Sequence, residues 1–306
     1  MQVFNRLIWH QPYALLTLTI MFWCGNFVVG EYTTKVTEHP VPPIQLAFVR
    51  WVCAAIILFP LAARSLWTER KEIFQHFPAI WIIGVSAYSF YNTCIYLALS
   101  YDGSNATSLA TLQTIFPAVV ACLGFIIFGV RINFSNTTGI ILAVLGGTVA
   151  TSQGDLFAAL KIQIGMAERW AFLAVLSYAL YTVLLRLRPN NVSSVPFLWM
   201  LIISGLTLLT PWWAWDTFAN GNQFPFSGEI VWALIYLAIF PSLISALCYN
   251  RAVQLIGPGA PSLSINLMPF GIAILFWISP LPSQLAWYHL LSLAMIFPGI
   301  WLIRKS

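Results

Sequence analysis

Long runs of apolar residues, separated by short polar connections, extend over the whole chain. Each run is close to the roughly 20 residues that an α-helix needs to cross the hydrocarbon core of a bilayer. Lipid offers the backbone no hydrogen-bond partners, so runs of this kind are predicted to be helices, which satisfy their own backbone groups. The pattern predicts ten membrane-spanning helices, at residues 12–31, 43–63, 77–99, 104–128, 134–152, 169–186, 195–215, 229–250, 259–279 and 284–303.

The charged residues between the runs provide an independent check of this count. If the N-terminus lies in the cytoplasm and the spans alternate, ten Lys and Arg residues fall in cytoplasmic segments and three in outer segments. Arg50, inside the second span, completes the 14 of the sequence. An excess of basic residues on the cytoplasmic side is the usual asymmetry of membrane proteins. We therefore expect an all-α, multi-pass membrane protein with both termini in the cytoplasm.

Composition supports the same class. The chain of 306 residues is 59% hydrophobic and 8% charged, with a mean hydropathy of +0.82, whereas soluble domains carry roughly 25% charged residues. The formal net charge of +5 is not concentrated in a Lys/Arg run. We therefore expect the lipid bilayer to surround the chain and expect no nucleic-acid partner.

An internal repeat divides the chain into two units of five spans, at residues 1–153 and 168–306. The segment Thr114-Ile115-Phe116-Pro117 in the fourth span matches Asn266-Leu267-Met268-Pro269 in the ninth, 152 residues later. Because five is odd, the second unit enters the membrane from the opposite side, which gives an inverted-topology repeat. Inverted repeats are typical of carriers that work by alternating access around a site near the midplane. The alternative is that duplication built a scaffold without transport.

Arg50 is the most informative single residue of the sequence. It follows Pro43 by seven residues, so it lies about 10 Å down the second span at the helical rise of about 1.5 Å per residue. A charge at that depth costs at least a few kcal/mol unless it is paired or hydrated. Two interpretations stay open. In the functional one, Arg50 anchors an anionic group such as a carboxylate or forms one half of a gate. In the structural one, it pairs with Glu31 at the outer end of the first span, and an outer-gate ion pair would be both.

Polar and aromatic residues recur at helical spacing on several of the predicted spans. In lipid, such stripes are expected to face protein or water. One interpretation is a central substrate pathway, and the other is a set of ordinary interhelical hydrogen bonds. The residues predicted to line the pathway, with Arg50 near its outer mouth, are Trp23, Asn26, Tyr88, Asn92, Gln113, Tyr178, Tyr181, Ser245, Tyr249 and Asn266. The matched prolines Pro117 and Pro269 are predicted to bend their helices.

Signatures of enzymes and of metal sites are missing from the sequence. It has no HExxH, GxSxG or Walker motif and no close pair of carboxylates within a span. We therefore expect no catalytic residue, no metal and no cofactor. No acidic residue lies near the middle of a predicted span, which favours a facilitator or exchanger over a proton-driven carrier.

Three stretches resemble signatures of a known family. They are the run from Phe22 to Gly30, the run from Leu46 to Trp51, and the run from Tyr249 to Val253 followed by Gly257-Pro258 and Ser262 through Pro269. The chain resembles the EamA-type carriers of the drug/metabolite transporter superfamily over nearly its whole length. The resemblance implies two inverted five-helix repeats, a location in the bacterial inner membrane, and the export of amino acids, metabolites or drugs. It also implies that Trp23, Asn26 and Arg50 lie beside the pathway.

Together these observations predict a secondary transporter that exports amino acids or related small molecules by alternating access. An importer of a small metabolite is the alternative within transport. A membrane-embedded enzyme, a channel and a scaffold are the alternatives from other classes. The expected partners are a small-molecule substrate and the lipid bilayer, and a homodimer stays open.

Overall fold

The computed structural model describes residues 9–101, 109, 113–131, 133–152, 154–155, 165–278 and 287–304. Within these residues the regular elements are all helices. Some parts of the fourth, ninth and tenth predicted spans lie outside the described residues.

Three long helical rods form the beginning of the chain. The first is α2 (Pro12–Glu31) with the π-helical η1 (Tyr32–Val36), and the second is α3 (Pro43–Thr68). The short α4 (Arg70–Gln75) leads to the third rod, whose parts are α5 (Phe77–Gly84), η2 (Val85–Tyr91) and α6 (Asn92–Ser100). Two shorter helices follow, α8 (Phe116–Phe128) and α9 (Phe134–Thr151).

The second half follows a similar order. Its helices are α11 (Met166–Leu184) with η3 (Leu185–Leu187), α12 (Ser194–Phe218), the rod of α13 (Gly228–Leu237), η4 (Ala238–Ile244) and α14 (Ser245–Ile256), then α15 (Gly259–Ser264), η5 (Ile265–Leu267), α16 (Met268–Ile278) and α17 (Trp287–Arg304).

Six of these rods are long and apolar enough to cross a membrane: Pro12–Val36, Pro43–Thr68, Phe77–Ser100, Met166–Leu187, Ser194–Phe218 and Gly228–Ile256. Shorter apolar helices lie at Phe116–Phe128, Phe134–Val149 and Leu290–Leu302. The structure therefore shows an all-helical, multi-pass membrane protein in its described residues. The count of ten spans stays a prediction.

Local sequence explains where several helices begin and end. Proline stands in the first turn of α2, α3, α5 and α8, where its missing N–H costs nothing and its fixed φ suits the helix. Gly129 ends α8 with a φ of 63°, a left-handed conformation that a residue without Cβ adopts easily. Proline and glycine thus mark the ends of elements whose interiors are set by their apolar composition.

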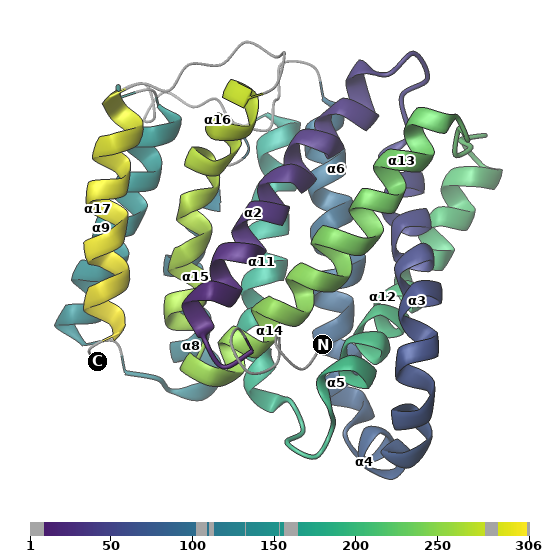
Figure 1. Ribbon diagram of the computed structural model, residues 1–306, viewed down its shortest axis with the longest axis horizontal. Coiled ribbons are helices and arrows are strands. Elements are labelled where there is room, and N and C mark those ends of the chain that lie inside the picture. Colours follow the sequence, from purple (N-terminus) through teal and green to yellow (C-terminus); the bar gives the residue numbers. More distant parts are fainter. Residues whose placement is uncertain are drawn as a thin grey trace.

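Helices α9 and α17 pack against each other at one end of the molecule, whereas α3 and α12 pair at the other end (Figure 1). Between them, α2 packs on α14 and α16, and α11 packs on α6 and α8. The α9–α17 contact is close: a Cβ added at Gly299 would lie 2.7 Å from the carbonyl oxygen of Gly139. Small residues permit this approach, which is how helices commonly associate in membranes.

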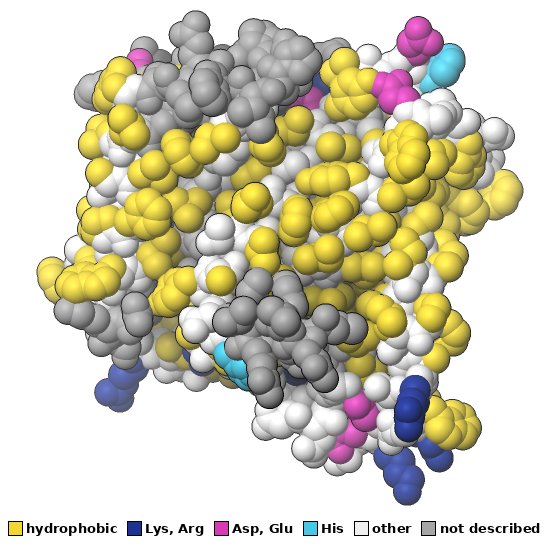
Figure 2. Space-filling view, in the orientation of Figure 1, with side chains coloured by type: hydrophobic (Ala, Val, Ile, Leu, Met, Phe, Trp, Pro, Cys, Tyr) yellow, Lys and Arg dark blue, Asp and Glu magenta, His cyan; other side chains and the backbone are white. Residues whose placement is uncertain are grey.

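The surface has the zonation of a membrane protein. Figure 2 shows hydrophobic side chains over the middle of the face in view, with Lys, Arg, Asp and Glu gathered toward its two rims. Large apolar side chains such as Ile56, Leu61, Ile126 and Trp232 are exposed. In water such a surface would promote aggregation, but in a bilayer it is matched by the acyl chains.

One π-helical segment interrupts the third rod of each half. Both η2 (Val85–Tyr91) and η4 (Ala238–Ile244) have seven residues. The first residue of η4 lies 153 positions after the first residue of η2, and the same separation holds for their last residues. A π-helical segment changes the register of the side chains that follow it, and such segments are frequent at functional sites. In this protein both of them contribute residues to the candidate site.

Candidate functional site

Arg50 lies inside the protein with a guanidinium surrounded by neutral groups. Only 2% of the residue is exposed. Its Nε donates to Oγ of Ser242 at 2.5 Å, and its Nη1 donates to Oδ1 of Asn26 at 2.6 Å and of Asn92 at 3.1 Å. Nη1 also donates to the hydroxyl of Tyr96. Among the described residues, Arg50 forms no ion pair, so its charge is stabilised by amide and hydroxyl dipoles and by the rings of Trp51 and Tyr96.

Three different rods position these partners, and Arg50 itself lies on a fourth, α3. Asn26 comes from α2, Asn92 and Tyr96 from α6, and Ser242 from η4. The Tyr96 hydroxyl donates to Asn26 Oδ1 at 3.0 Å. The Ser242 hydroxyl donates to the Leu237 carbonyl at 2.6 Å, which leaves its lone pairs for Arg50. Asn26, Tyr96 and Ser242 are therefore each oriented by a second contact, and the cluster joins the two halves of the chain.

Aromatic rings fill the space beside Arg50, and Tyr178 of α11 is at their centre. Its ring centroid lies 5.4 Å from that of Trp23, 4.5 Å from Tyr91, 4.9 Å from Tyr181 and 5.7 Å from Tyr249. These separations are in the range in which aromatic pairs attract each other. The cluster forms a layer of packed rings between the two ends of the rods.

A small cavity remains between Arg50 and the aromatic cluster. Its volume is about 20 Å³, which is room for about one water molecule. It is lined by Trp23, Asn26, Arg50, Trp51, Ala87, Tyr88, Tyr91, Asn92, Tyr178, Pro241 and Ala246. No metabolite fits in this volume, so the structure shows the centre closed.

Hydrogen bonds continue from the cluster toward the opposite end of the rods. The hydroxyls of Tyr88 and Tyr181 lie 3.4 Å apart, and the Tyr181 hydroxyl donates to Oδ1 of Asn250. The hydroxyls of Thr182 and Tyr249 lie 3.0 Å apart. A polar path thus runs through otherwise apolar packing from the central cavity to Asn250.

The structure brings most of the predicted pathway residues together. Trp23, Asn26, Arg50, Tyr88, Asn92 and Tyr178 line the central cavity, and Tyr181 and Tyr249 contact Tyr178. Gln113, Ser245 and Asn266 are buried but do not line it. Asn266 instead donates to the Ala143 carbonyl at 2.8 Å. Their part in a pathway stays a prediction.

Five of the lining residues were outside the predicted set, and two of these five, Trp51 and Tyr91, are aromatic. Trp51 stacks edge-on against Tyr88 at 4.6 Å, and the Arg50 guanidinium lies 4.9 Å from the centroid of the Trp51 ring. Tyr91 follows Tyr88 by three residues, a spacing that places two residues on one face of a helix. The sequence therefore carried a signal for Tyr91 that the predicted set did not use.

The structure shows where the predicted gate residue Glu31 and the predicted kink residues Pro117 and Pro269 lie. Glu31 is the last residue of α2 and is not among the hydrogen-bond partners of Arg50, so the gate pairing stays a prediction. Pro117 stands in the first turn of α8, directly after a break at 114–115. Pro269 stands in the first turn of α16, directly after η5.

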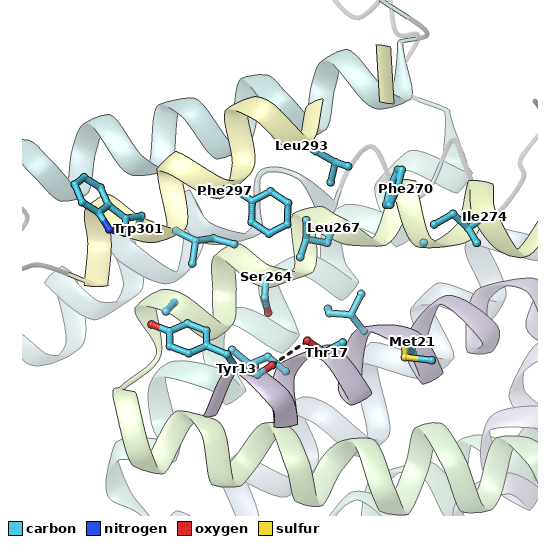
Figure 3. A pocket seen from close by; sticks show the side chains of 15 residues that line it. Tyr13, Thr17, Met21, Ser264, Leu267, Phe270, Ile274, Leu293, Phe297 and Trp301 are labelled. Carbon is cyan, nitrogen blue, oxygen red and sulfur yellow. Dashed lines mark hydrogen bonds between the residues drawn. The ribbon is translucent and has the colours of Figure 1, made fainter. Parts of the chain in front are cut away.

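A larger groove opens on the side of the molecule between α2 and the α15–α17 region (Figure 3). Its volume is about 610 Å³, and its lining is almost wholly apolar, with Leu267, Phe270 and Phe297 among the residues around it. The Thr17 hydroxyl, one of its few polar groups, donates to the Tyr13 carbonyl at 3.0 Å. Such a groove suits acyl chains and offers no charge to orient a polar ligand.

The residues described contain no group of three or more His, Cys, Asp or Glu side chains that could hold a metal ion. The polar chemistry of the site thus rests on one guanidinium with amide and hydroxyl groups. Such a set can bind and orient an anionic or zwitterionic molecule.

Comparison with known proteins agrees with this geometry. The family model described as "EamA-like transporter family" matches residues 11–152 and again 165–305. The chain belongs to the EamA-like transporter family. Both matches together include every residue of the Arg50 cluster and of the aromatic cluster.

Relatives of this EamA-like chain are transporters of unstated cargo. It is 26% identical to the uncharacterized transporter YxxF of Bacillus subtilis over 68% of this chain and 67% of that protein. It is also 26% identical to an uncharacterized transporter of Archaeoglobus fulgidus over 86% and 87% of the two chains. A protein of known crystal structure matches this chain with a TM-score of 0.71 and 15% identity, and the match covers 95% of both chains. The two proteins therefore share a fold.

Proposed function

We propose that this EamA-like chain is a secondary transporter that exports amino acids or related small metabolites from the cytoplasm by alternating access. In this proposal ten spans form two inverted five-helix repeats in the inner membrane, with both termini in the cytoplasm. The substrate crosses at the Arg50 cluster and the aromatic residues beside it.

The observation that carries the proposal is the buried charge of Arg50. A guanidinium with 2% exposure and no acidic partner among the described residues is short of negative charge. None of its described hydrogen bonds involves Nη2. A substrate carboxylate at this nitrogen would supply the missing charge, and charge-assisted hydrogen bonds of this kind are the strong ones.

The surroundings of Arg50 suit the remainder of an amino acid. Trp23, Tyr91 and Tyr178 offer ring faces to an apolar or aromatic side chain. Hydroxyls and amides from Tyr88 and Asn92 can accept hydrogen bonds from an ammonium group. A few polar groups in an apolar pocket are the usual composition of small-molecule sites.

A closed centre supports alternating access in preference to a permanent pore. The cavity of about 20 Å³ must enlarge before any metabolite can enter. The matched segments η2 and η4 lie at corresponding places of the two halves. Equivalent irregularities in both repeats would let the two halves exchange inward-open and outward-open shapes around one site.

The test is counterflow in proteoliposomes that contain the full chain. Vesicles are loaded with one amino acid or metabolite at a time, and uptake of the labelled compound is followed with and without a pH gradient. Saturable, protein-dependent exchange of one chemical class is expected, with no effect of the pH gradient. Flux that rises linearly with concentration would contradict a carrier and indicate a channel. Vesicles in which the chain has one known orientation then separate the two directions of transport: net efflux from the cytoplasmic side indicates an exporter, and net uptake into it indicates an importer.

A further inference from the structure

A second polar cavity lies at the end of the rods opposite to the Arg50 cluster. Its volume is about 270 Å³, which is large enough for a small metabolite. Two arginines and three amide side chains take part in its lining, which consists of Leu185, Arg186, Arg188, Asn190, Asn250, Val253, Gln254 and Gly257. None of these lining residues is acidic.

Arg188 is the unusual member of this set. It follows η3 and packs over the ring of Phe197, with its guanidinium carbon 4.8 Å from the ring centroid. Its Nη2 donates to the Val192 carbonyl and to Oγ of Ser194, both at 3.1 Å. Its Nε and Nη1 are buried and have no hydrogen-bond partner in the part of the chain that the structure describes. Buried N–H groups without acceptors are rare and costly, especially on a charged group.

The charges around Arg188 do not compensate it. Burial, with a smaller contribution from the charge of Arg251, lowers the pKa of Arg188 to about 10. Glu69 is the acid that acts on it electrostatically, but its two carboxylate oxygens accept from the backbone N–H and the hydroxyl of Ser193, at 2.9 and 2.7 Å. The positive charge at this cavity is therefore in excess.

The cavity also touches the path to the centre. Asn250 lines it, and Oδ1 of the same residue accepts the hydrogen bond from Tyr181. Tyr181 lies against Tyr88, which lines the central cavity. A molecule in the Arg188 cavity is thus separated from the centre by one pair of tyrosines.

We propose that the Arg188 cavity is a second binding site, which takes the carboxylate or phosphate group of the transported molecule at the cytoplasmic end of the path. The acceptor oxygens of that group satisfy Nε and Nη1 of Arg188 after a small adjustment of its side chain. Together with Arg50, the chain then has one cation for the anionic group at each end of the aromatic cluster. This inference rests on the proposed carrier function and adds that the cargo is an anion or a zwitterion.

The test measures binding without transport. The full chain is purified in neutral detergent, and its unfolding temperature is followed by tryptophan fluorescence. Sodium chloride is replaced stepwise by sodium acetate or sodium phosphate at constant ionic strength. A ligand that binds only the folded state raises the unfolding temperature in a saturable way. We expect such a rise for the native chain with at least one of the two probes, and its absence would overturn the proposal.

Three variants give the result its specificity. Arg188→Gln is expected to abolish the saturable rise. Arg188→Lys keeps the charge but lacks the planar fork, so the concentration at half-effect is expected to increase about tenfold. Arg64→Gln removes an exposed arginine and is expected to behave as the native chain. An unchanged rise in Arg188→Gln, or an equal loss in Arg64→Gln, would contradict a site at Arg188. Should Arg188→Gln fail to fold, Arg188→Lys decides instead, and an unchanged concentration at half-effect in that variant would contradict the site.

A second arm separates the soluble cargo from a lipid headgroup. The same titration in phosphatidylcholine nanodiscs is repeated with phosphatidylglycerol added. We expect equal midpoints in both. A midpoint raised by phosphatidylglycerol would show that the headgroup occupies the site, which would overturn its assignment to the cargo. Counterflow without any anion effect would refute this inference and leave the carrier intact. An anion effect without counterflow would leave an anion site at Arg188 but refute the carrier function on which its assignment to the cargo rests.

Discussion

Nη1 of Arg50 donates to Oδ1 of Asn26 at 2.6 Å, and the same oxygen accepts from the Tyr96 hydroxyl at 3.0 Å. The dipole of an amide on α2 thus stabilises the charge of a guanidinium on α3 without neutralising it. The contact has the geometry of a carboxylate–arginine pair, with the negative charge left out. This relationship makes Asn26 and Arg50 the most direct places to test the site.

Arg50→Gln is expected to reduce counterflow at least about tenfold, because the variant loses the charge that a substrate carboxylate requires. Arg50→Lys retains the charge but lacks the planar fork that contacts Ser242 and Asn26, so we expect a raised KM with residual transport. Arg64→Gln, on the exposed surface of the same helix, serves as the control. Native counterflow in Arg50→Gln would show that the substrate does not need this charge.

Asn26→Asp places a carboxylate where the structure has an amide, and it should occupy Arg50 permanently. We expect the variant to fold as well as the native chain and to lose most of its counterflow, since an internal acid competes with the substrate. Asn26→Leu instead leaves the cation and the Tyr96 hydroxyl without this acceptor, which should lower stability by about 1–3 kcal/mol. Counterflow at the native rate in Asn26→Asp would be incompatible with Arg50 as the carboxylate anchor.

Tyr178→Ala is expected to destabilise the fold by about 3–5 kcal/mol, as removal of a large buried aromatic ring commonly does. The ring contacts Trp23, Tyr91, Tyr181 and Tyr249, so these would border a void. Tyr178→Phe keeps the ring and should remain close to native in stability. Unfolding in sodium dodecyl sulfate titrations measures both variants, and equal stability of the two would argue against a central packing role for this ring.

The sequence allowed the prediction of Arg50 as a buried cation, because depth in a span follows from residue spacing alone. It also allowed the choice of Asn26, Asn92 and Tyr88, which lie on polar faces of helices. The same spacing would have allowed the choice of Tyr91, three residues after Tyr88, which the predicted set left out. The placement of Asn266 away from the central cavity depends on a carbonyl of α9, a tertiary contact that no local pattern encodes.

The membrane spans, too, could be predicted from the sequence only in part. Composition and run length predicted all six long rods. They also predicted spans at the shorter helices α8 and α9, whose described lengths are 13 and 18 residues. Breaks at 114–115 and at η5 lie inside predicted runs, since hydropathy averages over a window and does not register a local interruption of the helix.

Gly205→Ala should destabilise the fold by about 1–3 kcal/mol through overpacking. A Cβ at Gly205 would run into the Cβ of Tyr88 and lie 3.2 Å from the backbone nitrogen of Ser89. It would therefore push α12 away from η2 and displace a residue of the central cavity. Gly124→Ala is the matched control, because a Cβ there meets nothing within 4 Å and alanine favours the helix by up to about 1 kcal/mol. Loss of stability in both variants alike would show that the tight contact at Tyr88 is not the cause.

The orientation of the chain decides which cavity meets the cytoplasm, and single cysteines can report it. In a background with Cys122→Ser and Cys53→Ala, we would introduce Lys71→Cys at one end of the rods and Glu38→Cys at the other, both exposed. With the basic end inside, a membrane-impermeant thiol reagent added to intact cells should label only the Glu38→Cys variant. Disruption of the membrane should then make the Lys71→Cys variant reactive. The opposite pattern would place Arg188 outside, and its cavity would then receive cargo from the exterior, as in an importer.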